Sequence, residues 1–204
     1  MAFPNTPIID NFNRSNGSLG ANWNSIHSIV SNAVSVNANS GNSVNSLYTA
    51  SAYSANAEGY LTLTTLDGEI RVSIILNKLT TVVSNNDDMI VALYDDAQDR
   101  IEAYYWNGSS FNVPSISSGD RTVSFSNGDV LGAALVSGIL NVYKNSTFIV
   151  AFDCTGFTNL AGGYIGFRTS TTQSTVVVDD FGGGNISTGP VIPVFMNNYK
   201  QRRT

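Results

Sequence analysis

The chain has 204 residues, of which 42% are hydrophobic and 10% aromatic, enough to enclose one sizeable core. Only 12% are charged, so Asn, Ser and Thr must supply the polar surface, and these residues suit turns and strands better than helices. The net charge of −5 excludes a generally basic nucleic-acid-binding protein. We therefore predict an all-β protein that binds no nucleic acid.

Apolar runs separated by turn residues follow one another along the whole chain, which is the rhythm of a β-sandwich or barrel. No stretch predicts a helix convincingly. The predicted strands cover residues 7–13, 26–30, 33–37, 46–52, 60–66, 70–76, 88–95, 99–106, 121–125, 129–136, 139–144, 147–153, 162–169 and 174–181.

Turn residues between these strands predict how neighbouring strands connect. Asp67-Gly68 joins two strand patterns and is a favoured two-residue hairpin signal. Ser137-Gly138 joins the patterns VLGAALV and ILNVYK in the same way. Residues 37–46 contain mainly Asn and Ser, and we predict a polar loop there.

The first and last strand patterns resemble each other. Pro7 to Arg14 read PIIDNFNR, and Val176 to Gly184 read VVVDDFGGG. Each apolar run closes on Asp, a polar residue and Phe. We expect these two strands to lie side by side in one sheet and to close a single β-sandwich domain over residues 1–184.

The predicted strand 99–106 carries a candidate glycan-binding surface. Side chains alternate between the faces of a strand, so Glu102, Tyr104 and Trp106 share one face. A sugar ring can stack on such aromatic residues while the carboxylate accepts its hydroxyl hydrogens. We expect Tyr94, on the preceding strand, to extend this surface. The alternative is that these aromatic residues pack in the core or at a subunit contact.

Residues 185–204 differ from the body in composition. This segment contains Pro190 and Pro193, which suit a central strand poorly because proline has no backbone N–H donor. We predict an extended tail that is either frayed or docked on a partner protein. The predicted docking residues are Val191, Ile192, Phe195, Met196, Lys200, Arg202 and Arg203.

No catalytic residues are predicted. Glycoside hydrolysis needs two carboxyl groups held about 5–10 Å apart, whereas Glu58, Glu69 and Glu102 lie on separate predicted segments without a second acid two residues on. The single histidine, His27, lies in an ordinary alternating strand. The single cysteine, Cys154, is expected to be a buried core residue.

The segment from Asp10 to Trp23, DNFNRSNGSLGANW, resembles the start of concanavalin A-like, laminin G-like domains. The run from Gly128 to Asp153 resembles their central hairpins, and GGYIGFR at Gly162 to Arg168, followed by VVVDDF, resembles their closing strands. The resemblance covers nearly all of residues 7–184. It implies a jelly-roll sandwich of two curved antiparallel sheets.

The resemblance leaves several functions open, because this fold carries hydrolases, lectins, adhesion modules and capsid-surface proteins. Similar sequences suggest a non-enzymatic structural protein of a virus particle, either a phage capsid decoration or an appendage protein, which forms a homo-oligomer and contacts other virion proteins. The alternative is a carbohydrate-binding, lectin-like adhesion module. Glycoside hydrolysis ranks below both.

The resemblance also implies a possible calcium site, because related sandwiches often bind calcium through carboxylates at strand ends. Asp10, Asp179 and Asp180 would come together if the terminal strands pair. The alternative is that each Asp caps a turn through nearby backbone. A second acidic edge consists of Asp87, Asp88, Asp95, Asp96 and Asp99.

The first residues lack the basic and apolar regions of a secretory signal peptide. No apolar stretch approaches the length that a membrane span requires. We therefore expect a protein made in the cytoplasm of a host and located on the virion.

Overall fold

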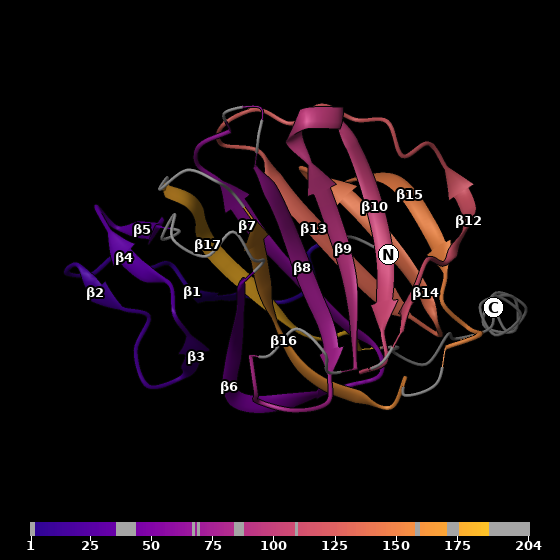
Figure 1. The fold of residues 1–204 in the computed structure, drawn as a ribbon, viewed down its shortest axis with the longest axis horizontal. Coiled ribbons are helices and arrows are strands. Elements are labelled where there is room, and N and C mark those ends of the chain that lie inside the picture. Colours follow the sequence, from indigo (N-terminus) through magenta and orange to yellow (C-terminus); the bar gives the residue numbers. More distant parts are fainter. Residues whose placement is uncertain are drawn as a thin grey trace, which may run out of the picture.

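The computed structural model describes residues 3–35, 44–66, 68, 70–83, 88–108, 110–157, 160–170 and 176–187. These residues form two antiparallel sheets that lie face to face (Figure 1). Within the described ranges, the helical structure is a short 3-10 turn, η2 (Asp96–Gln98), and no helix is long and apolar enough to cross a membrane. The prediction of an all-β sandwich is confirmed.

The larger sheet, which we call the first sheet, has ten strands. In spatial order these are β12 (Ser115–Gly119), β15 (Thr147–Asp153), β14 (Ile139–Lys144), β13 (Val130–Val136), β7 (Ala57–Leu63), β17 (Val176–Asn185), β5 (Ala33–Ser35), β4 (Ser28–Val30) and β2 (Gly17–Ser18), and β1 (Ile8–Asp10) also pairs with β17.

The smaller sheet, which we call the second sheet, has seven strands. In spatial order these are β11 (Phe111–Asn112), β10 (Arg100–Trp106), β9 (Met89–Asp95), β8 (Arg71–Lys78), β16 (Gly162–Ser170), β6 (Val44–Ser54) and β3 (Trp23–Ser25).

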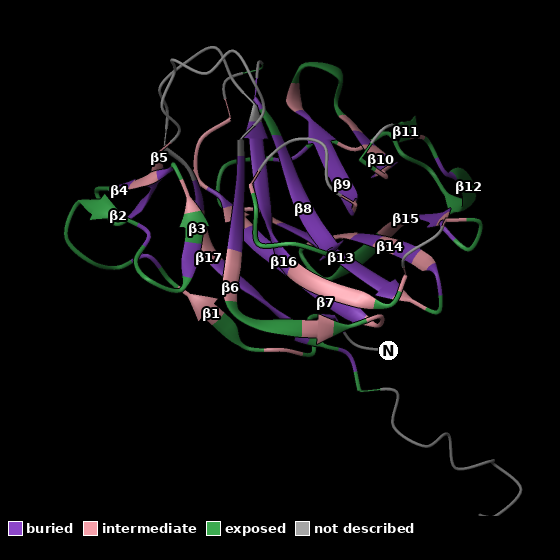
Figure 2. Ribbon diagram, turned by 60° about the horizontal axis from the view of Figure 1, so that its bottom comes forward, coloured by how far each residue is buried: buried purple, intermediate pink, exposed green. Residues whose placement is uncertain are grey.

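The main core lies between the inner faces of the two sheets. On β8, Val72, Ile74 and Leu76 point inward and are fully buried. Leu131 and Leu135 of β13 meet them from the first sheet. Burying such a side chain contributes about 1.5–3 kcal/mol relative to its exposure. Figure 2 shows β8 and β9 buried along most of their length and β2 exposed.

The first and last strands pair as predicted. Ile8 lies opposite Gly182 and Asp10 opposite Phe181, with a bulge between the two pairs. The phenylalanines that close the two similar sequence patterns, Phe12 and Phe181, are both fully buried. The two described ends of the chain therefore lie side by side.

The N-terminal segment crosses the outer face of the first sheet. Phe3 stacks on Tyr143, with ring centroids 4.2 Å apart and planes 2° apart, and meets the edge of Tyr60. Behind this segment, the buried carboxylate of Glu58 accepts hydrogen bonds from the Thr6 backbone N–H at 2.7 Å and from the Thr6 hydroxyl at 2.8 Å. The segment is thus anchored through both apolar and polar contacts.

One of the two predicted hairpins is confirmed. Ser137 and Gly138 adopt φ values of 51° and 80° and connect β13 to its neighbour β14. The hairpin predicted at Asp67-Gly68 is wrong, because β7 and β8 belong to different sheets. The Gly68 N–H donates to Asp96 Oδ2 at 2.6 Å, next to η2, so the chain passes here from one sheet to the other.

Several strand boundaries also differ from the prediction. Residues 121–125 form no strand, because this segment touches β10 through a single bridge between Thr122 and Arg100. The strands β2, β3, β11 and β12 were not predicted. Most of the predicted loop 37–46 and the tail after residue 187, including every predicted docking residue, lie outside the described residues.

Candidate functional site

A hollow lies on the outer face of the second sheet, above β8, β9 and β10. On β10, Glu102, Tyr104 and Trp106 all line it, so the predicted common face of these three residues is confirmed. The hollow has a volume of about 210 Å³. Its lining consists of Arg71, Ser73, Leu93, Glu102, Tyr104, Trp106, Phe111 and Arg168.

Three aromatic side chains form one wall of the hollow. The Phe111 ring lies 4.9 Å from the Tyr104 ring and 5.7 Å from the Trp106 ring, centroid to centroid. Tyr104 is only 8% exposed, whereas Phe111 is 53% exposed. The wall therefore runs from a buried phenol at its base to an open ring at its rim.

An apolar cluster continues from this wall along the outer face of the second sheet. Tyr104 and Leu93 belong to it, and Trp106 packs against it. Its other buried members are Leu47, Ile75, Met89 and Val91. Two rings of the wall, those of Tyr104 and Trp106, are therefore supported by close-packed apolar side chains.

Charged side chains lie beside the aromatic wall. Arg71 pairs with Asp95, with Nη2 3.0 Å from Oδ2, and Arg100 pairs with Glu102. Arg168 of β16 is 8% exposed, and its Nη1 has no hydrogen-bond partner among the described residues. The hollow thus combines aromatic surface, one carboxylate and guanidinium groups.

Burial governs the ionisation of two groups at the base of the hollow. It raises the pKa of the Tyr104 phenol, and the nearby Arg168 guanidinium opposes that rise. It lowers the pKa of Arg168, with Tyr104 acting in the opposite direction. The Tyr104 hydroxyl also hydrogen-bonds to Ser73. Tyr104 is therefore a neutral hydrogen-bonding group at neutral pH.

The prediction that Tyr94 extends the surface is wrong. Tyr94 lies opposite Ile101, on the inner face of the second sheet, and is fully buried. Its ring contacts Phe125, and its hydroxyl lies 3.2 Å from Asp96 Oδ1 and 3.1 Å from Asp99 Oδ1. Tyr94 therefore stabilises the core edge near η2.

Five residues of the hollow were not predicted as site residues. Arg71 and Ser73 lie two residues apart on β8 and therefore share one face of that strand, and Leu93 lies on β9. The alternation of side chains along each strand could have predicted which residues share the outer face. Phe111 lies on a two-residue strand, and Arg168 comes from a strand more than sixty residues away along the chain. Only the strand order brings these two residues to Tyr104.

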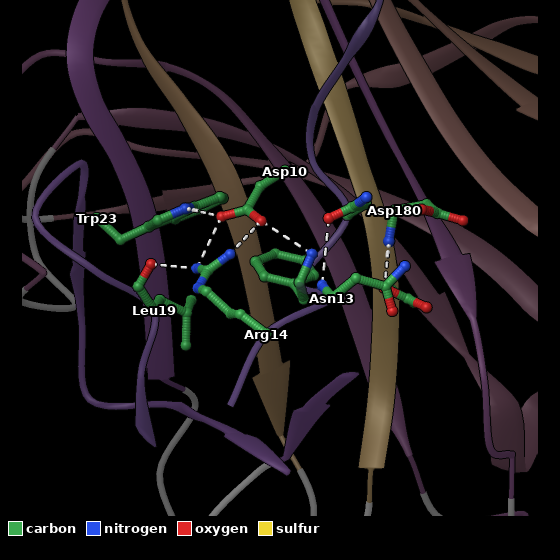
Figure 3. A network of polar contacts seen from close by, with 9 residues as sticks. Asp10, Asn13, Arg14, Leu19, Trp23 and Asp180 are labelled. Atoms are coloured by element: carbon green, nitrogen blue, oxygen red, sulfur yellow. Dashed lines mark hydrogen bonds and ion pairs between the residues drawn. The ribbon is translucent and has the colours of Figure 1, made fainter. Parts of the chain in front are cut away.

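Asp10 is the centre of a polar network at the start of the chain (Figure 3). Its carboxylate accepts hydrogen bonds from the Phe12 N–H at 2.8 Å, from Arg14 at 2.6 and 3.0 Å, and from Trp23 Nε1 at 2.8 Å. Arg14 also donates to the carbonyl of Leu19. Trp23 is buried in the core, and its indole N–H has Asp10 as a polar partner.

These contacts favour the capping alternative over the calcium alternative. Both Asp10 oxygens accept hydrogen bonds from Arg14, and Asp179 Oδ1 accepts one from the Asp180 N–H at 2.8 Å. Burial and the negative charges of Asp180 and Asp10 raise the pKa of Asp179, although the Asp180 N–H opposes this. Within the described ranges, no three His, Cys, Asp or Glu side chains are grouped as metal ligands.

The second predicted acidic edge is divided between separate contacts. Asp95 pairs with Arg71, while Asp96 and Asp99 lie close to the Tyr94 hydroxyl. Asp87 lies outside the described residues. Asp88 lies before the other end of β9, where its Oδ1 is 3.5 Å from the Tyr105 hydroxyl. The carboxylates of Asp95, Asp96 and Asp99 therefore support strands and turns around η2, and Asp88 is separate from them.

His27 and Cys154 are both buried. His27 Nε2 lies 2.8 Å from the Thr169 hydroxyl, its Nδ1 contacts the Ser46 hydroxyl, and burial lowers its pKa to about 4. Cys154 is fully buried, which raises the pKa of its thiol to about 12. Both side chains belong to the interior of the sandwich.

Comparison with protein-family models and with curated proteins finds no match. Solved structures do match the fold. The chain has the concanavalin A-like jelly-roll fold that its sequence resembles.

Three similar structures illustrate this fold. The carbohydrate recognition domain of Emp47p superposes with a TM-score of 0.58 at 12% identity, over 89% of this chain and 95% of that one. The carbohydrate binding module CBM66 from Bacillus subtilis gives 0.56 at 11%, over 81% and 93%. The Bacillus licheniformis beta-glucanase gives 0.54 at 9%, over 87% and 97%. These identities establish a common fold and no more.

Proposed function

We propose that this protein is a non-catalytic, lectin-like carbohydrate-binding module, and that the hollow above β10 is its binding site. The observation that carries this proposal is the wall formed by Tyr104, Trp106 and Phe111 beside Glu102. Two of the similar structures, the recognition domain of Emp47p and CBM66, are carbohydrate-binding by name, which supports the same choice.

The chemistry of the hollow suits a sugar. The apolar face of a pyranose can lie on the Trp106 and Phe111 rings, which provide rigid contact area at small entropic cost. The Glu102 carboxylate can accept hydrogen bonds from sugar hydroxyls, and the Arg71 guanidinium can donate to sugar oxygens. A few polar groups around an apolar wall are typical of small-ligand sites.

Hydrolysis is less well supported than binding. The lining of the hollow, so far as the structure describes it, contains one carboxyl group, Glu102, and this group is paired with Arg100. Asp95 lies on the adjacent strand, but it is fully buried and is paired with Arg71. Glycoside hydrolases require two carboxyl groups on either side of the scissile bond.

A location on a virus particle remains a prediction. The predicted docking tail lies outside the described residues, and the similar structures provide no independent support for a virion. A lectin-like module on a particle surface would use the same hollow, so the binding proposal does not depend on this location.

The binding proposal can be tested on a glycan array, followed by calorimetric titration of the best ligand. We expect Trp106→Ala and Phe111→Ala each to weaken binding about tenfold or more, because each removes aromatic contact area from the wall. Phe148→Ala is the matched control, since Phe148 is 44% exposed but lies on β15 of the first sheet.

The control variant should bind as tightly as the unmodified protein. Full binding by both wall variants would show that the hollow is not the site. Failure of the unmodified protein to bind any glycan would contradict the proposed function itself.

A further inference from the structure

The charges around the hollow do not balance. Arg71 is paired with Asp95, and Arg100 is paired with Glu102. Arg168 has no ion pair with any described residue, and its Nη1 is a buried atom without a hydrogen-bond partner in the described part of the chain. Three guanidinium groups and two carboxylates leave one uncompensated positive charge, and it lies at the base of the hollow.

An unpaired buried charge is costly, so its position is informative. Arg168 is 8% exposed and lines the hollow directly. Removing a cation from water without a partner carries a large desolvation penalty. Burial accordingly lowers the pKa of this guanidinium. The neutral Tyr104 phenol beside it cannot supply the missing negative charge at neutral pH.

We propose that the hollow takes an anionic sugar, whose carboxylate or sulfate group binds the guanidinium of Arg168, which lines the hollow, while the sugar ring lies against Tyr104 and Trp106. This inference rests on the proposed function, because it names the class of glycan that the same hollow binds. The planar guanidinium suits both anions, since its N–H donors match the spacing of two oxygens on one anionic group.

A neutral sugar fits the hollow less well. Its hydroxyls could hydrogen-bond to Arg168, but the charge would stay uncompensated after the ligand had displaced water from the hollow. Glu102 does not compete for Arg168, because it pairs with Arg100 on its own strand. An acidic sugar supplies the one charge that the described residues lack.

The first test compares two forms of one ligand by calorimetry. An oligogalacturonate and its methyl ester have the same rings and linkages, but only the free acid carries carboxylates. We expect the acid to bind at least about tenfold more tightly, as a charge-assisted hydrogen bond to a buried group predicts. A neutral oligosaccharide with and without sulfate forms the second pair.

Preference for the charged member of either pair supports the proposal, and the pair that shows the preference identifies the anion. Equal binding of both members in both pairs would overturn it. If such charge-independent binding still requires Trp106, the proposed carbohydrate-binding function stands without this inference. Absence of binding to all four ligands overturns this inference, and only the absence of binding on the whole glycan array contradicts the proposed function itself.

Arg168→Met provides an independent test. This variant keeps an unbranched apolar stem of similar reach and removes the charge, so the preference for the acid should fall at least about tenfold while binding of the ester is retained. Lys144→Met is the control, because it removes one positive charge from β14 of the first sheet. An unchanged preference in folded Arg168→Met would overturn the inference. If the variant does not fold, the acid and ester comparison decides.

Discussion

At the scale of single residues, the contacts of Asp10 explain why Asp, Phe, Arg and Trp occur together in the segment from Asp10 to Trp23. Its carboxylate receives four hydrogen bonds from Phe12, Arg14 and Trp23. The rings of Phe12 and Trp23 then pack against Phe167 and Phe181 of β16 and β17. Asp, Phe, Arg and Trp are thus needed together, because each orients another.

We expect Asp10→Ala to lower the free energy of unfolding by about 3 kcal/mol, since it removes an ion pair and leaves the Trp23 N–H without its acceptor. Asp10→Asn, which retains an oxygen acceptor, should cost less. Chemical denaturation followed by Trp fluorescence measures both.

Asp153→Asn is the matched control for these variants. Asp153 also caps a turn, through the N–H and the hydroxyl of Thr155, but among the described residues it has no hydrogen bond to an Arg or Trp side chain. The free energy of unfolding of Asp153→Asn should be close to that of the unmodified protein. If the Asp10 and Asp153 variants lowered the free energy of unfolding equally, the stabilising role assigned to the Asp10 hydrogen bonds would be contradicted.

From the sequence, the candidate site could be predicted only for residues that lie on one strand. Alternation along one strand places Glu102, Tyr104 and Trp106 together without any knowledge of the sheet. It does not relate two strands to each other, since a shift of one residue in register turns every side chain to the opposite face. Tyr94 was misplaced for this reason, and Arg168 was missed.

At the scale of elements, the segment before β1 acts as a strap across the first sheet. Glu58 accepts hydrogen bonds from Thr6, and the Tyr60 hydroxyl donates to the Thr6 carbonyl at 2.8 Å. Phe3 then covers Gly132, where a Cβ atom would lie 2.2 Å from its ring. The strap is therefore a fitted part of the sheet surface.

We expect Glu58→Ala to release this strap and to lower the free energy of unfolding by about 2 kcal/mol, because the partly buried N–H and hydroxyl donors of Thr6 lose their acceptor. Hydrogen exchange should show the Thr6 amide exchanging much faster, while amides of β9 in the opposite sheet stay protected. Glu102→Ala, an acid on that opposite sheet, is the control and should leave exchange at Thr6 unchanged. Slow exchange at Thr6 in Glu58→Ala would contradict this anchoring role.

Turn signals predicted reversals of the chain better than they predicted pairing. Ser137-Gly138 and Asp67-Gly68 look alike in sequence, yet the first joins adjacent strands and the second leads from one sheet to the other. Whether the strand after a turn pairs with the strand before it depends on which of the two sheets it joins. The arrangement of the whole sandwich decides this, and the turn residues do not. The short strands β2, β3 and β11 were missed because two or three residues show no measurable alternation.

At the scale of the whole molecule, stability should decrease in weak acid because of His27. Its pKa is about 4 when folded, below the ordinary value of 6.5, so the unfolded chain binds more protons between these values. Stability is therefore retained above pH 6.5 and falls as the pH drops toward 4, by on the order of 3 kcal/mol in all.

Thermal unfolding between pH 8 and 4.5 measures this dependence. His27 is the single histidine of the chain, so a His27→Gln variant should show a much flatter slope between pH 6.5 and 5. The reference point for both proteins is pH 8, where residue 27 is uncharged in the variant and in the unmodified protein. An identical slope in the two proteins would contradict the assignment to His27.

The pairing of β1 with β17 also determines how the molecule would be presented on a support. Phe3 and Ile186, near the two described ends, pack in one apolar cluster on the outer face of the first sheet. The hollow opens on the outer face of the second sheet, across the full thickness of the sandwich. A support coupled next to Phe3 or Ile186 would therefore leave the hollow facing the solution. Copies arrayed in this way would bind a repetitive polymer of the proposed ligand with the gain in avidity that multivalent attachment provides.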